Sequence, residues 1–401
     1  MEDDDAGYDN IQDIRCNVQK NKQKTELILA ANVIIIDEAF SLNKYVLLSA
    51  INSYDGFKGK IILLLMDRGQ TAPVVKNGSR QQTVDSTILN LSLWNEIDMS
   101  TFSVNLRLRA MQNANALDPH YIRQLEYAKS LIEIRTNGPF RLDGPVQEIC
   151  VNEISGEKKL VFMNQKYFTN FTQACNWLYP LGWKTAAFED RAILATTNSA
   201  VDEWNAFIQN MNPSDTHVLL SANELDDVDD DLGILSGMLN ADTLEYYSKP
   251  GIPIHRLELK EGDICFLLRT VSKGDGLSKN TRVRIVRISA YRILVRKLEG
   301  NRSLHIISRL RFLVPHYSGF TLIRTQFPLG LAYAMTKNKS QGQSIVWLLN
   351  DIRGDAFAHG QEYVSESRPI DVDQVAFFAS PEQVDSGHVI FSNVVYSELF
   401  A

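Results

Sequence analysis

The chain has 401 residues, of which 44% are hydrophobic and 22% charged, a composition typical of a folded protein with two or three domains. No apolar run reaches membrane-spanning length, the acidic first residues argue against a secretory or transit signal, and the cysteines and histidines show neither a zinc pattern nor a disulfide framework. The net charge is −7, yet residues 256–311 hold 14 Lys or Arg against five Asp or Glu, so any nucleic-acid-binding surface should be local.

The first half of the chain alternates predicted strands and helices. Residues 31–40 (ANVIIIDEAF) and 60–66 (KIILLLM) indicate two buried strands, with a helix over residues 43–54 between them. This alternation predicts a parallel sheet, whose strands end in carboxylates at one crevice. A short strand is expected at residues 102–104 and a helix at residues 119–134.

The second half begins with a predicted helix at residues 171–183 and continues with a strand at residues 191–198 (RAILATTN) and a helix at residues 201–211. Residues 215–253 are expected to be rich in loops. Short alternating runs with Gly turns then predict a small antiparallel β unit, a barrel, over residues 257–314, with an Arg-rich polar face. Further strands are expected at residues 346–349 and 372–378.

Carboxylates and a glutamine follow the first two predicted strands. In a phosphoryl-transfer site, one acid of the pair Asp37-Glu38 would hold Mg²⁺ and the other would orient or deprotonate the attacking water. The simpler alternative is a strand that ends in two exposed acids. Gln70, three residues after the second strand-end acid Asp67, could sense the γ-phosphate. Arg107 suits either a phosphate contact or a surface ion pair.

Two late segments carry further candidate residues. In residues 327–345 (FPLGLAYAMTKNKSQGQSI), an apolar strand passes into a polar turn whose N–H, hydroxyl and amide groups could bind DNA phosphates. Residues 360–368 end in Arg368, which could act as an arginine finger, reaching from a second domain to a nucleotide held by the first.

Together these segments resemble the DNA helicases of the petite-integration-frequency (PIF) family in superfamily one, especially the branch found in Helitron transposons. The segments that carry the resemblance are VIIIDEAF (33–40), residues 66–94, NLRLR (105–109), AILATTNSAVDEWN (192–205), LKEGDICFLLR (259–269), FPLGLAYAMTKNKSQGQS (327–344) and EYVSESR (362–368). The resemblance covers roughly residues 31–399.

The resemblance implies an α/β fold of two RecA-like P-loop NTPase domains, the first incomplete, with the small β-barrel inserted in the second. The implied domains are residues 1–112, a helical connection over 113–185, and 186–401 interrupted by 257–314. It also implies ATP and Mg²⁺ as cofactors, single-stranded or forked DNA as partner, 5′→3′ movement, a monomer, no membrane, and the nucleus or, with a targeting segment, the mitochondrion.

Roles follow by position in the family motifs. Asp37 and Glu38 would be the Mg²⁺ and water-activating acids, and Gln70 the γ-phosphate sensor. Arg107 and Arg368 would reach the γ-phosphate from either side. The residues implied in DNA binding or in coupling DNA to nucleotide are Thr197, Asn198, Lys339, Ser340, Gln341 and Gly342.

The sequence also departs from the family pattern. No G-x-x-x-x-G-K-[ST] loop occurs in the 401 residues, so the backbone cradle for phosphates, its Lys and its Mg²⁺-binding hydroxyl are lacking. The chain is therefore expected to be a fragment that is inactive alone. Near the predicted finger the family has Ala-Leu-Ser-Arg, whereas this chain has Ser365-Glu366-Ser367-Arg368, and Glu366 either pairs with Arg368 or faces solvent.

Three functions stay open at this point. The first is an ATP-dependent DNA helicase seen as a fragment. The second is a non-catalytic protein that still binds single-stranded DNA through its basic insertion. The third is a decayed reading frame, because an incomplete first domain would expose a sheet edge and apolar surface.

Overall fold

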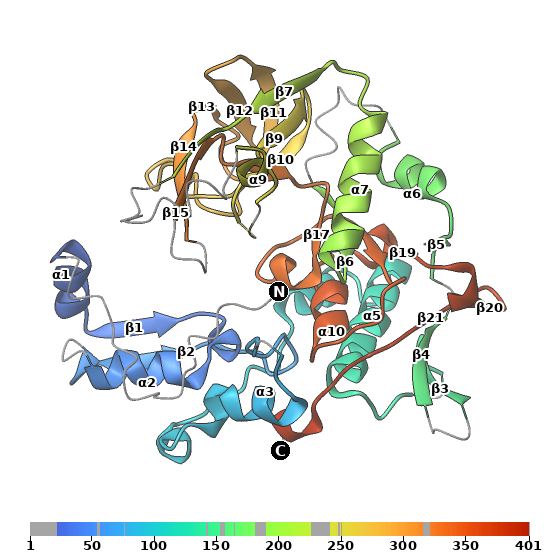
Figure 1. Cartoon of the computed structure of the whole chain (residues 1–401). Helices are drawn as coiled ribbons and strands as arrows, with labels where there is room; N and C mark the ends of the chain where they lie inside the picture. The colour runs from blue at the N-terminus through green and yellow to red at the C-terminus, as the bar shows by residue number, and fades with distance from the viewer. Residues whose placement is uncertain are drawn as a thin grey trace. The chain divides into compact units, whose positions relative to one another are not determined.

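The computed structural model describes residues 22–53, 57–75, 77–141, 143–152, 157–163, 165–180, 190–225, 241–247, 249, 251–315 and 321–400 (Figure 1). These residues form two compact units. Unit 1 holds the described residues within 175–193 and 198–335, and unit 2 holds those within 22–174, 194–197 and 336–400. The predicted domain boundaries divide the chain elsewhere and remain a prediction.

Unit 2 begins with a two-stranded parallel sheet. Strands β1 (Val33–Ile36) and β2 (Ile61–Leu64) pair in parallel, with Val33 opposite Ile61 and Ile36 opposite Leu64. Helix α2 (Lys44–Ser53) covers one face of this sheet, where Leu47 and Ile51 pack with Ile36 and Leu64 (Figure 1).

The opposite face of this sheet lies open in the described part of the chain. Ile35 and Ile61 are 61% and 62% exposed, and Val33, Leu63 and Leu65 are exposed as well. The prediction of a parallel pair is confirmed, but the prediction that both strands are buried is wrong for this face. Apolar runs in parallel sheets are normally covered on both sides, and here α2 covers one.

The rest of unit 2 is built around a larger core. In the sheet of order β17-β6-β18-β19-β5, strands β18, β19 and β5 are parallel, and β6 and β17 are the strands through which the chain passes between the units. An antiparallel sheet of order β20-β21-β4-β3 supplies the second layer. Aromatic side chains from both sheets and from α5 pack together in the core: Tyr127, Phe162, Phe377 and Phe391.

The strands of these two sheets are β3 (Val146–Asn152), β4 (Glu157–Phe162), β5 (Tyr167–Phe168), β6 (Arg191–Ala195), β17 (Ala334–Thr336), β18 (Trp347–Asp351), β19 (Val375–Phe378), β20 (Val384–Asp385) and β21 (His388–Phe391). The α-helices besides α2 are α1 (Lys22–Ala30), α3 (Arg80–Ser86), α4 (Leu106–Ala114), α5 (Pro119–Thr136), α6 (Phe171–Leu178) and α10 (Gln361–Glu366). Short 3-10 turns are η3 (Ala39–Ser41), η5 (Ile88–Asn90), η6 (Trp94–Glu96), η8 (Lys337–Ser340), η9 (Val372–Gln374), η10 (Pro381–Gln383) and η11 (Ser397–Leu399).

Helix α5 shows how local sequence sets the helix limits. The Asp118 side chain accepts the N–H of His120, Pro119 occupies the first helical position, and Asn137 closes the helix in the left-handed conformation with φ 56°. Each residue type suits its position, because a short polar side chain caps N–H groups, Pro tolerates the first turn, and Asn tolerates positive φ.

Unit 1 is mainly antiparallel. Its largest sheet has the order β13-β12-β11-β10-β16, a second has the order β14-β15-β8, and β7 pairs with β9. The bounds are α7 (Asn198–Met211), β7 (Thr216–Leu220), β8 (Ala222–Leu225), α9 (Ala241–Tyr246), β9 (Arg256–Lys260), β10 (Ile264–Leu267), β11 (Arg282–Ile288), β12 (Ile293–Lys297), β13 (Leu304–Ile307), β14 (Leu310–Pro315), β15 (Thr321–Gln326) and β16 (Leu329–Leu331). The inward side chains alternate along the strands and form one apolar core that includes Val283, Ile285, Val295 and Leu329.

Most predicted elements are present, with four differences. The helix expected at residues 171–183 ends at Leu178, and residues 181–189 lie outside the described residues. The region expected to be loops contains β7, β8 and α9. The antiparallel unit extends beyond residues 257–314 to include β16. The strand expected at residues 102–104 does not form, and Phe102 is 93% exposed.

None of the helices in the described residues combines the length and apolarity that crossing a membrane requires.

Candidate nucleotide and DNA site

The acids that follow β1 lie at a tight turn. Glu38 has a left-handed backbone with φ 53°, and its N–H donates to Asp37 Oδ1 at 2.9 Å. Asp37 is exposed and Glu38 is half-buried, so both carboxylates reach the surface of unit 2. Neither acid forms an ion pair among the described residues. Free carboxylate oxygens at a strand end are suitable ligands for a hard cation such as Mg²⁺.

The Gln341 side chain bridges Glu38 to the loop after β2. Gln341 Nε2 donates to Glu38 Oε2 at 2.9 Å, and Gln341 Oε1 accepts the hydroxyl of the buried Thr71 at 2.7 Å. Both ends of one amide are therefore engaged. A residue expected on the DNA path thus contacts the expected water-activating acid directly.

Gln70 is the neighbour of Thr71 in this loop. Its Oε1 is buried and has no hydrogen-bond partner in the described structure. An unpaired buried amide oxygen is costly, so it is a natural position for a bound water or ligand donor. Because rotation of the amide exchanges its oxygen and nitrogen, the same position can also present N–H groups to a phosphate oxygen.

Asp67, at the end of β2, joins three segments of unit 2. Its Oδ1 accepts the N–H of Gly69 and the Nε–H of Arg135, both at 2.9 Å, and its Oδ2 accepts the Tyr363 hydroxyl at 2.8 Å. Arg135 lies in the last turn of α5 and Tyr363 lies in α10. Asp67 therefore fixes its own loop to both helices.

The start of α10 packs directly on the same loop. Gly360 has φ +76°, and a Cβ there would lie 2.2 Å from the Gly69 carbonyl oxygen and 2.7 Å from that of Gln70. His359 Nε2 lies 2.7 Å from the Arg68 carbonyl oxygen, and its Nδ1 lies 2.9 Å from the Tyr396 nitrogen. Since a backbone N–H donates and a carbonyl accepts, His359 is neutral with its proton on Nε2. Burial lowers the pKa of His359, which favours this neutral form.

Arg368 follows α10 and is half-buried. Its Nε donates to the Val364 carbonyl oxygen at 2.9 Å, and one terminal nitrogen donates to Ser367 Oγ at 2.8 Å. Burial lowers the pKa of Arg368, while the negative charges of Glu38 and Asp67 act in the opposite direction. The guanidinium therefore lies in the field of the acids after β1 and β2.

Arg107 is exposed and also acts electrostatically on Arg368. It occupies the first turn of α4, whose N-terminal residue Asn105 caps the N–H groups of Arg107 and Leu108. The short strand expected before Arg107, at residues 102–104, does not form, because the chain there is extended without a strand partner up to Asn105.

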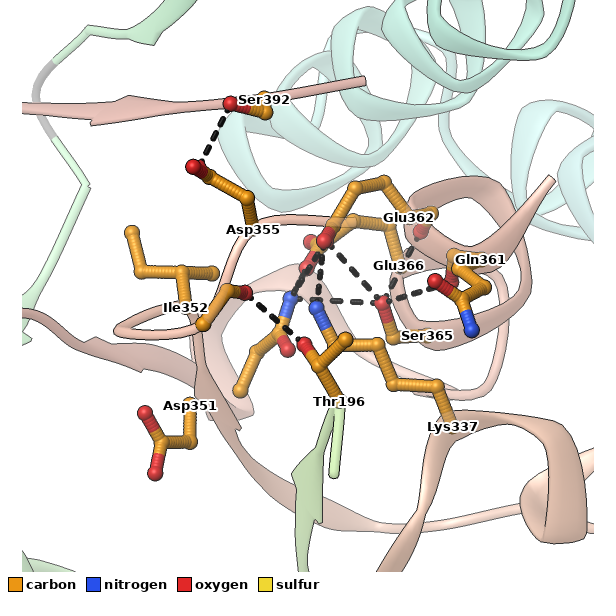
Figure 2. Close-up of polar contacts among 12 residues, drawn as sticks. Thr196, Lys337, Asp351, Ile352, Asp355, Gln361, Glu362, Ser365, Glu366 and Ser392 are labelled. Carbon is orange, nitrogen blue, oxygen red and sulfur yellow. Dashed lines mark hydrogen bonds and ion pairs between the residues drawn. The ribbon is translucent and has the colours of Figure 1, made fainter. Parts of the chain in front are cut away.

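Glu366 belongs to a buried polar cluster, shown in Figure 2. Lys337 and Glu362 form an ion pair at 2.5 Å that is almost wholly inaccessible to solvent, and Asn350 donates to Glu366 Oε1. Tyr127 lies 2.8 Å from Glu366 Oε2. Both alternatives for Glu366 are wrong: it neither pairs with Arg368 nor faces solvent.

The residues expected to bind DNA differ in accessibility. Thr197, Asn198, Lys339 and Gly342 are exposed, and Gly342 has φ +75° with open space around its Cα. Ser340 is fully buried, and its hydroxyl donates to the Lys337 carbonyl oxygen at 2.7 Å. Ser340 thus stabilises η8 and does not present its hydroxyl to a ligand here.

The Arg-rich face of unit 1 is smaller than the sequence predicts. Arg282 is buried and donates to the carbonyl oxygens of Arg191 and Ala332. Arg284 and Arg296 are opposite each other across β11 and β12, so they lie on one side of the sheet, half-buried and exposed respectively. The position of an arginine along its strand therefore decides whether its side chain is buried in the fold or accessible for binding phosphates.

Comparisons with known proteins find one matching family model and several solved structures of similar fold. Residues 6–138 match the family model of PIF1-like helicases. The match spans 133 of the 401 residues, and over this part the chain is similar to PIF1-like helicases. No curated protein matches it.

Solved structures show the same mixed α/β fold. The chain is similar to the crystal structure of the Pif1 helicase from Candida albicans, with a TM-score of 0.57 and 18% identity over 90% of this chain and 75% of that chain. It is also similar to Bacteroides Pif1 bound to single-stranded DNA, with a TM-score of 0.56 and 16% identity over 89% and 72% of the two chains. The structure of Bacteroides Pif1 with ADP-AlF3 and single-stranded DNA matches equally, with a TM-score of 0.56.

Sequence reasoning missed several residues that shape the candidate site. Thr71 and Tyr363 lie beside predicted residues, so their position in the motifs could have drawn attention to them. Arg135 lies far away in sequence, and only the fold brings it to Asp67. The group His120, Asp371 and Asp373 has metal-ligand spacing, but Asp373 already accepts two hydrogen bonds from Arg123.

Proposed function

We propose that this chain is the larger part of an ATP-dependent DNA helicase, in which nucleotide hydrolysis drives 5′→3′ movement on single-stranded or forked DNA. The observation that carries the proposal is the Gln341 bridge between Glu38 and Thr71. One amide from the segment expected on the DNA path contacts both a candidate hydrolytic acid and the loop of the candidate sensor Gln70. DNA that moves Gln341 would therefore alter Glu38.

Each side chain has a chemically suitable task. Asp37 and Glu38 would hold Mg²⁺, which neutralises phosphate charge when bound, and Glu38 would accept a proton from the attacking water. Gln70 would orient that water or the terminal phosphate through its unpaired amide oxygen or its nitrogen. Arg368 and Arg107 would stabilise the negative charge that develops on the transferred phosphoryl group.

DNA would contact the exposed residues Thr197, Asn198, Lys339 and Gly342, together with Gln341. The small β unit, which we infer to be the barrel of the family, would supply further arginines for the phosphates. The nucleus as location, and the monomer as the state at low protein concentration, are part of the same proposal.

These 401 residues contain no G-x-x-x-x-G-K-[ST] loop, so nothing within them supplies the usual grip on the β- and γ-phosphates. We therefore expect the chain by itself to bind single-stranded DNA and to hydrolyse ATP negligibly. A non-catalytic DNA-binding protein would share this behaviour in isolation.

The two functions separate when a phosphate-binding segment is supplied. A chain extended at its N-terminus with the corresponding segment of a PIF1-like relative should show DNA-stimulated ATP hydrolysis, measured as phosphate release. Glu38→Gln in that extended chain should lower turnover by at least about 100-fold, because general-base catalysis contributes factors of this size. Turnover equal to that of the unchanged acid would refute the assigned role of Glu38, and the absence of any turnover would favour the non-catalytic function.

A further inference from the structure

A cavity of about 470 Å³ opens in unit 1 where β7 ends and β9 begins, and none of its lining residues has been discussed as a nucleotide or DNA contact. Its lining residues are Leu220, Glu245, Tyr246, Ile254, His255, Arg256 and Arg324. The volume is sufficient for one ring system, and concave sites of this kind on a scaffold of strands are common ligand sites.

One side of the cavity is apolar and accessible. Tyr246, at the end of α9, is 86% exposed, and Leu220 and Ile254 are 52% and 51% exposed. Single exposed apolar side chains are normal on protein surfaces, but three around one cavity are not. A tyrosine ring beside two aliphatic side chains offers a surface on which another planar ring can stack.

Two guanidinium groups flank Leu220. Arg256 is its partner across the β7–β9 ladder, and Arg309 donates to the Leu220 carbonyl oxygen at 2.5 Å. Arg256 also reaches Glu258 at 2.7 Å, but both groups are about half exposed and such pairs are weak. Arg309 has no acidic partner among the described residues. The flanks of the cavity can thus accept anions.

The cavity also contains a polar pair. His255 Nε2 lies 3.4 Å from Glu245 Oε1, while His255 Nδ1 lies 2.8 Å from Ser221 Oγ. Arg324 is fully buried and donates hydrogen bonds to Asn223 and to the Leu244 and Pro253 carbonyl oxygens. It therefore has a structural role at the bottom of the cavity. Donor and acceptor groups beside an apolar wall suit the edge of a heterocycle.

We propose that this cavity binds one nucleotide of single-stranded DNA, with the base stacked on Tyr246 and the neighbouring phosphates on Arg256 and Arg309. An apolar slot for a ring, with one guanidinium in its lining and a second bonded to the lining residue Leu220, matches a base and its phosphates better than it matches an uncharged ring. The inference rests on the DNA-binding part of the proposed function and adds a contact outside the motifs that define it.

Binding of a fluorescein-labelled oligothymidylate to the full chain, followed by anisotropy at several salt concentrations, tests the assignment. Tyr246→Ala should weaken binding about tenfold with an unchanged salt slope, because stacking on an aromatic ring releases no counterions. Tyr246→Phe should retain the affinity. Arg309→Gln should weaken binding and reduce the salt slope by about one.

Tyr291→Ala is the matched control, since Tyr291 is 81% exposed in the same unit and does not line the cavity. Thermal unfolding checks that every variant folds. If the unchanged chain binds DNA and Tyr246→Ala binds equally well, the cavity assignment is overturned while the proposed function stands. If the unchanged chain binds no DNA at low salt, the proposed function and the cavity assignment fail together.

Discussion

Two short contacts of the Tyr127 hydroxyl favour a protonated Glu366 carboxyl. The Tyr127 oxygen lies 2.8 Å from both the Glu366 carbonyl oxygen and Glu366 Oε2. A hydroxyl has one proton, so both contacts are full hydrogen bonds when Tyr127 donates to the carbonyl oxygen and a protonated Glu366 carboxyl donates to the Tyr127 oxygen. Burial, together with the charge of Glu362, raises the pKa of Glu366 to about 7, which agrees with this geometry.

Glutamine at position 366 would imitate the protonated carboxyl, since its amide can donate to Tyr127 and accept from Asn350. A group whose pKa is raised on folding stabilises the protein most at low pH, and this stability is lost as the pH rises through about 7. The unchanged protein should therefore lose about 3 kcal/mol of unfolding free energy as the pH rises from 4.5 to 7.5, and the Glu366→Gln variant should not show this loss. Unfolding midpoints of both proteins across this range, compared as a difference curve, measure the effect.

Other groups change the pH profile in both proteins alike. The lowered pKa of His359 makes stability fall as the pH drops below about 6.5, and the difference curve cancels this contribution. Parallel profiles for the unchanged protein and the Glu366→Gln variant would show that the carboxyl titrates normally and would contradict the protonated state.

At the scale of elements, α10 and the loop after β2 are packed together so closely that we expect them to move as one rigid body. His359, Gly360 and Tyr363 contact the segment from Asp67 to Gln70 through a ring nitrogen, a backbone surface and a hydroxyl. Arg368 lies directly beyond α10. A shift of the sensor loop would therefore move the candidate finger with it.

Gly360 and Gly342 allow the cost of a steric clash to be measured apart from the cost of a positive φ. Gly360 and Gly342 have φ of +76° and +75°, but only Gly360 faces atoms within 4 Å. Gly342→Ala should cost about 1 kcal/mol from positive φ alone. Gly360→Ala should cost more than twice as much, because the new Cβ would displace the loop backbone.

Urea denaturation of both variants measures the difference. Equal losses of stability would mean that the α10 start has room to relax and that the packing on Gly69 and Gln70 is loose. A larger loss for Gly342→Ala would contradict the structural account outright.

The elements themselves could largely be predicted from the sequence, since apolar runs and caps act locally. β1, β2, α5 and β19 follow from such patterns. The expected strand at residues 102–104 fails because a strand needs a partner, and in the described chain Phe102 has none. A local sequence pattern shows that a segment can form a strand, but whether it does so depends on a distant segment that can pair with it.

The sequence predicted which residues belong to the candidate site, but not which hydrogen bonds they form with one another. Gln341 was assigned to DNA by its polar turn, and the fold shows it on Glu38 and Thr71. Ser340 has the residue type of a phosphate contact, yet burial commits its hydroxyl to η8. Whether a side chain is free for a ligand depends on which residues cover it in the fold, and a single sequence does not show this.

For the whole molecule, the uncovered face of β1 and β2 matters most. Five apolar side chains lie on it at 43–62% exposure. Contiguous apolar surface of this kind favours association or the binding of apolar dyes. We expect the chain to associate with itself at rising concentration.

Adjacent residues on β1 test this surface. Ile35→Lys should reduce dye binding and self-association, seen by fluorescence and sedimentation velocity, with a change in stability of no more than about 0.5 kcal/mol. Ile36→Lys, which points at α2, should destabilise unit 2 by about 2–4 kcal/mol. Equal destabilisation by both would show that the outer face is covered in solution.

The Lys337–Glu362 pair constrains how this sequence can change. Replacing Lys337 alone would leave a buried, unpaired carboxylate at a cost of about 3–5 kcal/mol, whereas replacing both residues with apolar ones of similar volume would be close to neutral. The two positions are therefore epistatic. A lineage that carries one member of this buried ion pair is committed to the other, and single replacements that leave one charge unpaired pass through an unstable intermediate.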